Sequence, residues 1–361
     1  MPKSSPFCAL RGRWSDAAQY SREAARAPAR KVAPLCITQY NGGSLLPAHA
    51  RRKAPTMEMT IRTIPCAPDD EGEVVATLLS AAPAMPSGRG VLYLHGFVDY
   101  YFHDHVAQEF LARGYAFHAL ELRKYGRSLR AHQSPNFCRS LSDYYEELDK
   151  ALELMAADGI TDVTLLGHST GGLLALLYAA DGAHRQAIRR IILNSPFLDF
   201  REPALTAAAL KLLSNSVGRL RPRLVLPKGL DPNYGASLHA SRRGEWDFNL
   251  AWKPLEGFPI YMGWVRAVAA GQRRAQAGLG LAIPILLLHS DKSIQSAAWS
   301  DDYMRADGVL NVAHMRRYGP GLGREVELHE VPGGMHDLFL SPQPVRDHAL
   351  AATFAWLERR R

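Results

Sequence analysis

Apolar and polar residues follow two different periods along the chain from residue 57 onward. Short apolar runs of β type alternate with segments of helical spacing, and turn-forming residues separate them. The expected strands are 59–64, 74–80, 90–94, 115–120, 163–166, 188–193, 284–288 and 325–331. The expected helices are 102–113, 141–157, 173–180, 311–318 and 344–358. This order predicts an α/β protein whose mostly parallel sheet is covered by helices on both faces.

The alternation is interrupted between residues 197 and 282. This stretch has no clear strand pattern, and it contains three tryptophans and proline-rich turns. An insertion of about 85 residues is too long for an ordinary loop, so it predicts a helical cap after the sixth strand. The expected organisation is therefore a core in two parts, 57–196 and 283–361, with a cap at 197–282.

The basic charge of the chain is concentrated at its N-terminus. The whole sequence has 43 Lys and Arg against 35 Asp and Glu, and residues 1–56 hold ten of the basic residues and two of the acidic ones. The remainder is formally neutral, which argues against a nucleic-acid partner. Residues 1–56 have little periodicity and are predicted to be a disordered basic extension without a catalytic role.

The cysteine spacing and the hydropathy of the chain indicate where in the cell the protein is expected. The four cysteines are widely spaced and form no CxxC pair, so neither a zinc site nor a disulfide scaffold is expected. No apolar run approaches the roughly 20 residues that span a bilayer, and residues 1–30 lack the apolar core of a secretory signal. We expect a cytoplasmic protein without stable membrane insertion. The oligomeric state is left open.

The segment 163–172 carries the most specific chemical signal. An apolar strand pattern ends in Gly-His-Ser-Thr-Gly, and an apolar helical run follows at once. Gly-x-Ser-x-Gly in this strand–turn–helix context presents a serine hydroxyl at a sharp turn. Gly167 and Gly171 suit positions with little room for a side chain. Ser169 is therefore predicted to be a nucleophile held in a strained conformation at the top of the sheet.

A serine nucleophile needs a base and a group that orients the base. His336 lies on a glycine-rich loop just after the last expected strand, from which it can reach over the sheet toward Ser169. Two carboxylates compete for the third position. Asp291 follows the seventh strand almost directly, whereas Asp307 precedes a hydrophobic pair and a helix. We prefer Asp307 and keep Asp291 as the alternative acid.

The negative oxygen of a tetrahedral intermediate needs hydrogen-bond donors. The backbone N–H of Thr170 is one expected donor, and the N–H of Phe97, in the loop after the third strand, is the other. Gly96 lets the backbone approach closely. His95 is expected to brace this loop by hydrogen bonds.

These motifs together resemble the α/β-hydrolase superfamily, and more narrowly its serine aminopeptidase, lysophospholipase and monoacylglycerol lipase-like group. The resemblance is carried by residues 92–97, 120–128, 167–172, 306–310 and 334–337. Glu121 and Lys124 stand where that group usually has Asp and Gly. About fifteen extra residues precede Asp307. The resemblance implies an eight-stranded α/β-hydrolase fold and serine hydrolase activity on an ester or amide, with no cofactor or metal.

The cap gives a hint about the substrate. Its aromatic residues, placed over Ser169, would suit an acyl chain, or they pack the cap on itself and on the sheet. These aromatics are Phe197, Phe200, Trp246, Phe248, Trp252, Phe258, Tyr261 and Trp264. The residues expected to contact a small acyl ester substrate are His95, Gly96, His168, Trp246 and Trp252.

We expect the protein to hydrolyse carboxylic esters, and two other functions are kept as alternatives. An aminopeptidase or amidase would need an acidic group in the cap, for which Glu202, Glu245 and Glu256 are available. A non-catalytic binding module is the second alternative, since a fold alone does not determine function.

Overall fold

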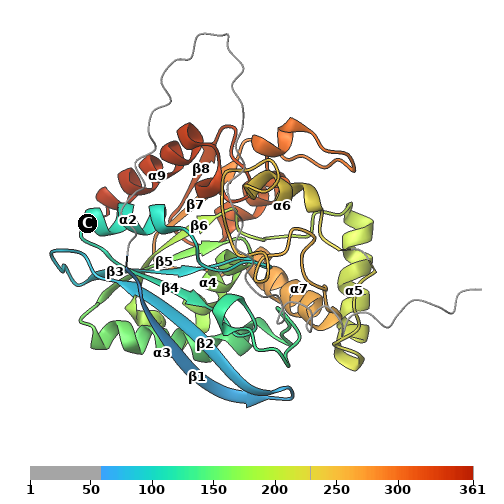
Figure 1. Cartoon of the computed structure of the whole chain (residues 1–361), viewed down its shortest axis with the longest axis horizontal. Coiled ribbons are helices and arrows are strands. Elements are labelled where there is room, and N and C mark those ends of the chain that lie inside the picture. Colours follow the sequence, from blue (N-terminus) through green and yellow to red (C-terminus); the bar gives the residue numbers. More distant parts are fainter. Residues whose placement is uncertain (1–57, 228, 361) are drawn as a thin grey trace, which may run out of the picture. The chain divides into compact units, whose positions relative to one another are not determined.

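The computed structural model describes residues 58–227 and 229–360, and the predicted N-terminal extension lies outside this part. An eight-stranded sheet forms its centre, in the order β1-β2-β4-β3-β5-β6-β7-β8 (Figure 1). The strands are β1 (Thr60–Asp69), β2 (Gly72–Ala81), β3 (Arg89–Leu94), β4 (Ala116–Glu121), β5 (Asp162–His168), β6 (Ile188–Asn194), β7 (Ile285–Ser290) and β8 (Val326–Val331). β2 pairs antiparallel with β1 and β4, and the other pairs are parallel. The predicted mostly parallel sheet is confirmed.

Helices cover both faces of this sheet. The α-helices of the described residues are α2 (Asp104–Ala112), α3 (Tyr145–Ala157), α4 (Thr170–Asp181), α5 (Ala204–Leu220), α6 (Pro232–Leu238), α7 (Met262–Gln276), α8 (Val312–Tyr318) and α9 (Gln343–Glu358), of which α5 and α6 belong to the segment between β6 and β7. One apolar cluster packs α3, α4 and α7 on one face, and a second packs α2 and α9 on the other. Leu165 belongs to the first cluster and Leu166 to the second, because successive strand residues point to opposite faces.

The segment between β6 and β7 consists of helices and loops. α5 packs against α7 at Gly218, where a Cβ atom would lie 2.5 Å from the carbonyl oxygen of Met262. α7 itself belongs to the core, since Val265 and Val268 join the cluster that α4 fills. α5 reaches the same cluster through Ala207. The boundaries expected for the cap, 197–282, stay a prediction.

The loop after β4 accommodates its unusual residues through buried ion pairs. Lys124 has a φ of 66°, in the left-handed region where glycine is favoured. Its ammonium group is 1% exposed and lies 2.6 Å from Asp69 and 2.5 Å from Glu71. Glu121 is fully buried and accepts hydrogen bonds from the N–H groups of Tyr101 and Arg127. Lys124 and Glu121, which stand where the family usually has Gly and Asp, are thus each held by ionic or hydrogen-bonding partners.

Within residues 58–227 and 229–360, no helix has both the length and the apolar character that crossing a bilayer requires.

The buried histidine His118 couples stability to pH. It lies on β4, is 3% exposed, and burial lowers its pKa from 6.5 to about 4. The unfolded chain therefore binds a proton between pH 6.5 and pH 4 that the folded protein does not bind. Stability contributed by this neutral side chain is lost as pH falls through that window.

We predict that His118→Gln reduces the loss of unfolding free energy between pH 7 and pH 5 by about 2 kcal/mol, because the substituted side chain cannot titrate. Urea unfolding at the two pH values measures the difference. His132→Gln, at an exposed position, is the matched control and should keep the wild-type pH dependence. An unchanged pH dependence in His118→Gln would contradict the argument.

Candidate active site

Ser169 lies in the turn between β5 and α4 and has a positive φ of 52°. A Cβ atom at Gly171 would overlap the carbonyl oxygens of Leu94 and His95, and one at Gly167 would lie 2.6 Å from the carbonyl oxygen of Gly171. The turn is thus pressed against the end of β3, and only glycine fits on either side of the serine. Its strained backbone agrees with the sequence interpretation.

His336 joins Ser169 to Asp307. Its Nε2 atom lies 3.0 Å from the Ser169 hydroxyl, and its Nδ1 atom lies 2.9 Å from Asp307 Oδ2. The exposed fractions of the three residues are 7% for the serine, 3% for the histidine and 0% for the aspartate. Burial opposes ionisation of Asp307, but nearby His336 and two backbone N–H groups hold its pKa below the usual value. The arrangement can therefore take a proton from the hydroxyl.

Asp307 reaches this position because the chain leaves β7 and returns. The Asp307 N–H donates to the carbonyl of Lys292 at 2.9 Å, and the Ile294 N–H donates to the carbonyl of Asp307 at 2.9 Å. The extra residues form an excursion, 295–306, whose two ends meet beside the end of β7. Asp291 instead accepts a hydrogen bond from the Gly333 N–H at 2.8 Å and so supports the loop that carries His336.

The loop after β3 lies directly against the serine. A Cβ atom at Gly96 would lie 3.2 Å from the Cβ atom of Ser169. Among the described loops and turns, neither the Phe97 N–H nor the Thr170 N–H donates to another residue. Both amides at the predicted oxyanion positions are therefore available to a ligand. Asp99 accepts a hydrogen bond from the Gly96 N–H at 3.3 Å.

His95 braces this loop from within. Its Nε2 atom accepts a hydrogen bond from the Leu122 N–H at 3.1 Å, so Nδ1 carries the proton and donates to the Gly96 carbonyl at 2.8 Å. Burial lowers the pKa of His95, which favours this neutral form. Both ring nitrogens of His95 are engaged and the residue is 1% exposed, so it braces the loop as the sequence predicted. The same burial argues against the substrate contact that was also expected of His95.

His168 is likewise placed behind the reactive groups. Its ring packs against the ring of His336 with 4.8 Å between centroids, and Nδ1 lies 3.2 Å from the carbonyl oxygen of Asn194. Burial lowers its pKa to about 4, so the ring is neutral near pH 7. The His168 side chain thus packs against His336, and its burial argues against the substrate contact that was expected of His168.

The two tryptophans expected to contact substrate pack the cap onto the core. Trp246 donates a hydrogen bond to the Leu340 carbonyl at 2.8 Å and stacks on His105. Trp252 packs edge-on against Tyr100. The two tryptophan rings pack against core residues. This favours the alternative in which these cap aromatics pack the cap rather than line a substrate pocket.

Two other aromatic side chains lie closer to the predicted reactive groups. The ring of Tyr234, on α6, is 5.6 Å from that of His336, and its hydroxyl accepts a hydrogen bond from the Asp337 N–H at 3.2 Å. The ring of Trp264 is 4.0 Å from that of Phe97. Sequence reasoning included Trp264 among the cap aromatics but missed Tyr234, because α6 is short and carries no motif.

Three buried side chains beside the serine come close enough to suggest a metal site. Ligand atoms of Asp99, His168 and Asp337 lie within 4.8 Å of one another. However, the Lys253 ammonium group is 2.6 Å from Asp99, and His103 Nε2 is 2.9 Å from Asp337. A cation already neutralises one carboxylate and a histidine binds the other. The residues therefore fit a polar network better than a resident metal ion.

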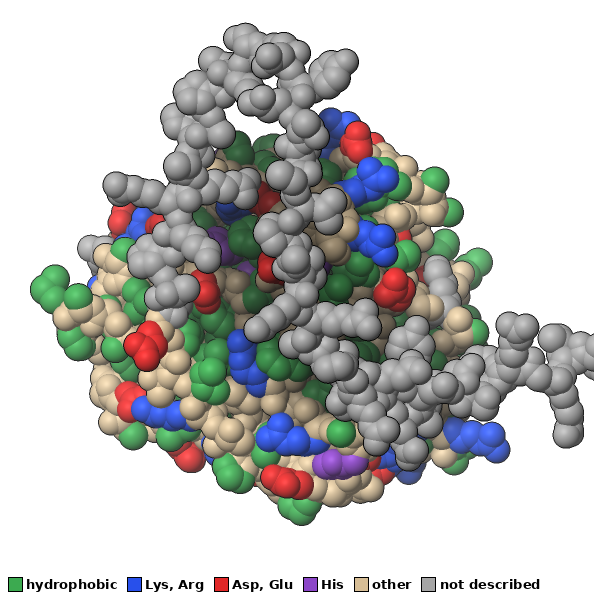
Figure 2. Space-filling model, in the orientation of Figure 1, with side chains coloured by type: hydrophobic (Ala, Val, Ile, Leu, Met, Phe, Trp, Pro, Cys, Tyr) green, Lys and Arg blue, Asp and Glu red, His purple; other side chains and the backbone are tan. Residues whose placement is uncertain are grey.

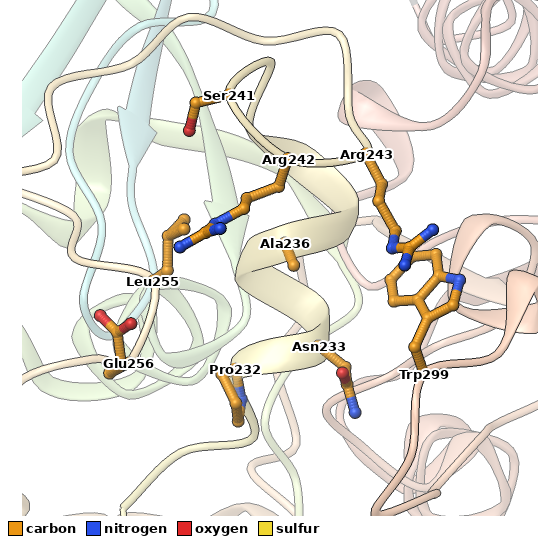
Figure 3. Close-up of a pocket in the computed structure, with 9 residues that line it drawn as sticks. All are labelled: Pro232, Asn233, Ala236, Ser241, Arg242, Arg243, Leu255, Glu256 and Trp299. Carbon is orange, nitrogen blue, oxygen red and sulfur yellow. The ribbon is translucent and has the colours of Figure 1, made fainter.

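A cavity of about 540 Å³ lies on the outer side of α6 (Figure 3). Arg242 extends toward Leu255 and Arg243 lies beside Trp299, so the two guanidinium groups point to opposite sides of the helix. Neither Ser169 nor His336 lines this cavity.

The sheet order, the serine turn after β5 and the histidine after β8 define an α/β-hydrolase. The model of the serine aminopeptidase, S33, hydrolase family matches residues 86–343, which is more than half of the chain. The protein belongs to this family. No curated protein matches the sequence.

Solved structures of lipases and esterases share this fold. A soluble variant of monoglyceride lipase from Saccharomyces cerevisiae, in complex with a substrate analog, has 17% identity and a TM-score of 0.63 over 86% of this chain and 100% of that one. Monoacylglycerol lipase from Paleococcus ferrophilus has 20% identity and a TM-score of 0.59 over 78% and 98%. An esterase from Exiguobacterium antarcticum has 15% identity and a TM-score of 0.53 over 79% and 96%. At these identities the likeness concerns the fold.

Proposed function

We propose that the protein is a serine esterase that cleaves lipid-like or small acyl esters through an acyl-enzyme. The observation that carries this proposal is the position of His336, whose two ring nitrogens lie 3.0 Å from Ser169 Oγ and 2.9 Å from Asp307 Oδ2. A nucleophile, a base and an orienting carboxylate in this order are the groups that a serine hydroxyl needs for acyl transfer.

In the proposed reaction, the Ser169 hydroxyl attacks the ester carbonyl while His336 Nε2 takes its proton. Asp307 stabilises the imidazolium that forms, and the N–H groups of Phe97 and Thr170 bind the negative oxygen. The imidazolium protonates the leaving alcohol as the tetrahedral intermediate collapses. His336 then activates water, which attacks the acyl-enzyme and releases the carboxylic acid and the free serine.

Aromatic packing at the oxyanion loop supports an acyl ester. Trp264 contacts Phe97, and Phe197 stacks on Trp264 at 6.4 Å, so apolar rings lie next to the predicted oxyanion donors. Two of the acidic cap residues considered for an amidase lie elsewhere. Glu245 forms an ion pair with Arg346, and Glu256 lines the cavity on the outer side of α6.

The outer face of α5 supports a lipid-like substrate. Four of its leucines are largely exposed, with fractions from 58% to 87%. They are Leu205, Leu212, Leu213 and Leu220. Figure 1 shows α5 at the edge of the folded part, beside α7. An apolar stripe of this kind suits contact with a lipid surface. On the part of the surface that is coloured in Figure 2, Lys and Arg side chains are interspersed with Asp and Glu.

The nucleophile is tested with a fluorophosphonate probe. We expect the wild-type protein to be labelled and Ser169→Ala to remain unlabelled, because only an activated serine reacts at an appreciable rate. A series of p-nitrophenyl esters of increasing chain length then reports the preferred acyl group. A folded wild-type protein that resists labelling and cleaves no ester would favour the non-catalytic alternative.

The acid is tested by exchanging each carboxylate for an amide. Asp307→Asn should lower kcat roughly 10³- to 10⁴-fold, since His336 loses the partner that orients and stabilises its charged form. Asp291→Asn should stay close to wild type, because the oxygen of its carboxylate that accepts from the Gly333 N–H and the Ser290 hydroxyl can be replaced by an amide oxygen. Both variants are compared by steady-state kinetics on p-nitrophenyl butyrate. The opposite ranking would move the acid to Asp291.

The α5 stripe is tested by making it polar. Leu212→Ser combined with Leu213→Ser should slow hydrolysis of a long-chain monoacylglycerol presented in vesicles several-fold, because less apolar surface can bind the lipid. The rate on dissolved p-nitrophenyl butyrate should not change. Ile61→Ser, at an exposed position on β1, is the matched control. Equal loss on both substrates would show that the stripe acts on folding rather than on lipid contact.

A further inference from the structure

The two reacting side chains are carried by loops far apart in the sequence. Ser169 follows β5 and His336 follows β8, 167 residues later. Because β6 and β7 separate these strands in the sheet, some contact across the end of the sheet has to maintain the 3.0 Å distance between Ser169 Oγ and His336 Nε2.

Asn194, the last residue of β6, contacts both loops. Its backbone carbonyl accepts a hydrogen bond from the Ser169 N–H at 3.0 Å and one from His168 Nδ1 at 3.2 Å. Its side-chain amide donates to Asp337 Oδ1 at 2.7 Å, and its side-chain oxygen accepts from the Leu338 N–H at 3.2 Å. One fully buried residue thus binds the serine turn through its main chain and the histidine loop through its side chain.

Asp337 completes this connection from the histidine side. It directly follows His336, is 1% exposed, and accepts a hydrogen bond from the Phe339 N–H at 3.1 Å besides that from Asn194. Its second oxygen lies 2.9 Å from His103 Nε2, at the start of α2. Burial opposes its ionisation, but the hydrogen bonds with His103 and Asn194 hold its pKa far below the ordinary value, so the carboxylate is charged.

We propose that Asn194 and Asp337 are positioning residues: their buried hydrogen bond fixes the histidine loop relative to the serine turn. Neither residue contacts the reacting atoms, since Ser169 and Asp307 occupy the two ring nitrogens of His336. The inference rests on the proposed esterase function. By holding Ser169 and His336 at the right distance, Asn194 and Asp337 raise kcat. A displacement of about 1 Å between nucleophile and base costs on the order of 100-fold in rate.

Swapping the two side chains tests the proposal. Asn194→Asp places two carboxylates together, and Asp337→Asn places two amides together. Each single variant should lower kcat on p-nitrophenyl butyrate on the order of 10- to 100-fold with little change in KM. The double variant N194D/D337N restores an amide–carboxylate hydrogen bond with reversed polarity and should recover most of the lost kcat. The rate of fluorophosphonate labelling should follow kcat in all three.

Active-site titration separates positioning from loss of folded protein, because kcat is then expressed per labelled serine. Asn311→Asp is the matched control: the side-chain oxygen of Asn311 caps α8, and a carboxylate can replace it there. If Asp337→Asn yields no folded protein, Asn194→Ser, which keeps the backbone carbonyl and removes the amide, takes its place.

Folded single variants with wild-type kcat per labelled serine would overturn the positioning role and leave the esterase proposal intact. A double variant no better than the worse single variant would also overturn it. Failure of the wild-type protein itself to react with the probe would instead overturn the proposed function.

Discussion

The close packing of the serine turn against the end of β3 is the constraint on which the site depends. Gly171 meets the carbonyl oxygens of Leu94 and His95, so no side chain can be inserted there without separating α4 from the sheet. This contact sets the position of Ser169 and also brings Gly96 to its side. Ser169, the predicted nucleophile, and the predicted oxyanion loop are therefore placed by one steric contact between backbones.

Around this contact several charged side chains are buried, and each is paired with a nearby residue. Asp99 bonds to Lys253 from the cap, Asp337 bonds to His103 and Asn194, and Asp307 bonds to His336. Removing one partner from such a pair leaves a charge or a donor without compensation in a medium of low dielectric. The ion pair between Lys253 and Asp99 also connects the cap to the oxyanion loop, so the cap contributes to the geometry beneath it.

The cap itself has two faces with different chemistry. Toward the core, Tyr234 and Trp246 form hydrogen bonds with residues of the histidine loop and of the segment after it. Away from the core, α5 exposes leucines, and the cavity behind α6 is lined by arginines, an asparagine and a tryptophan. The inner face thus supports the predicted reactive groups, and the outer face carries the exposed leucines on which the proposed lipid contact depends.

The sequence by itself determined the strands, the serine turn and the choice of His336, because each depends on local rules. Short apolar runs between turn-forming residues predict strands, and glycines at 167 and 171 mark a turn without room for side chains. It also ranked Asp307 above Asp291, although spacing alone left both open. Only the tertiary structure placed Asp307 beside His336, through an excursion whose two ends pair at the edge of the sheet.

The roles of Tyr234, Asn194 and Asp337 were also decided by the tertiary structure alone. The contacts that define these roles join residues at least 25 positions apart in the chain, and no periodicity or motif in the sequence relates these particular residues. The tryptophans of the cap show the same limit. Their composition was equally compatible with a substrate pocket or a packed interface, and the direction in which each ring points depends on how the cap docks, which local sequence does not encode.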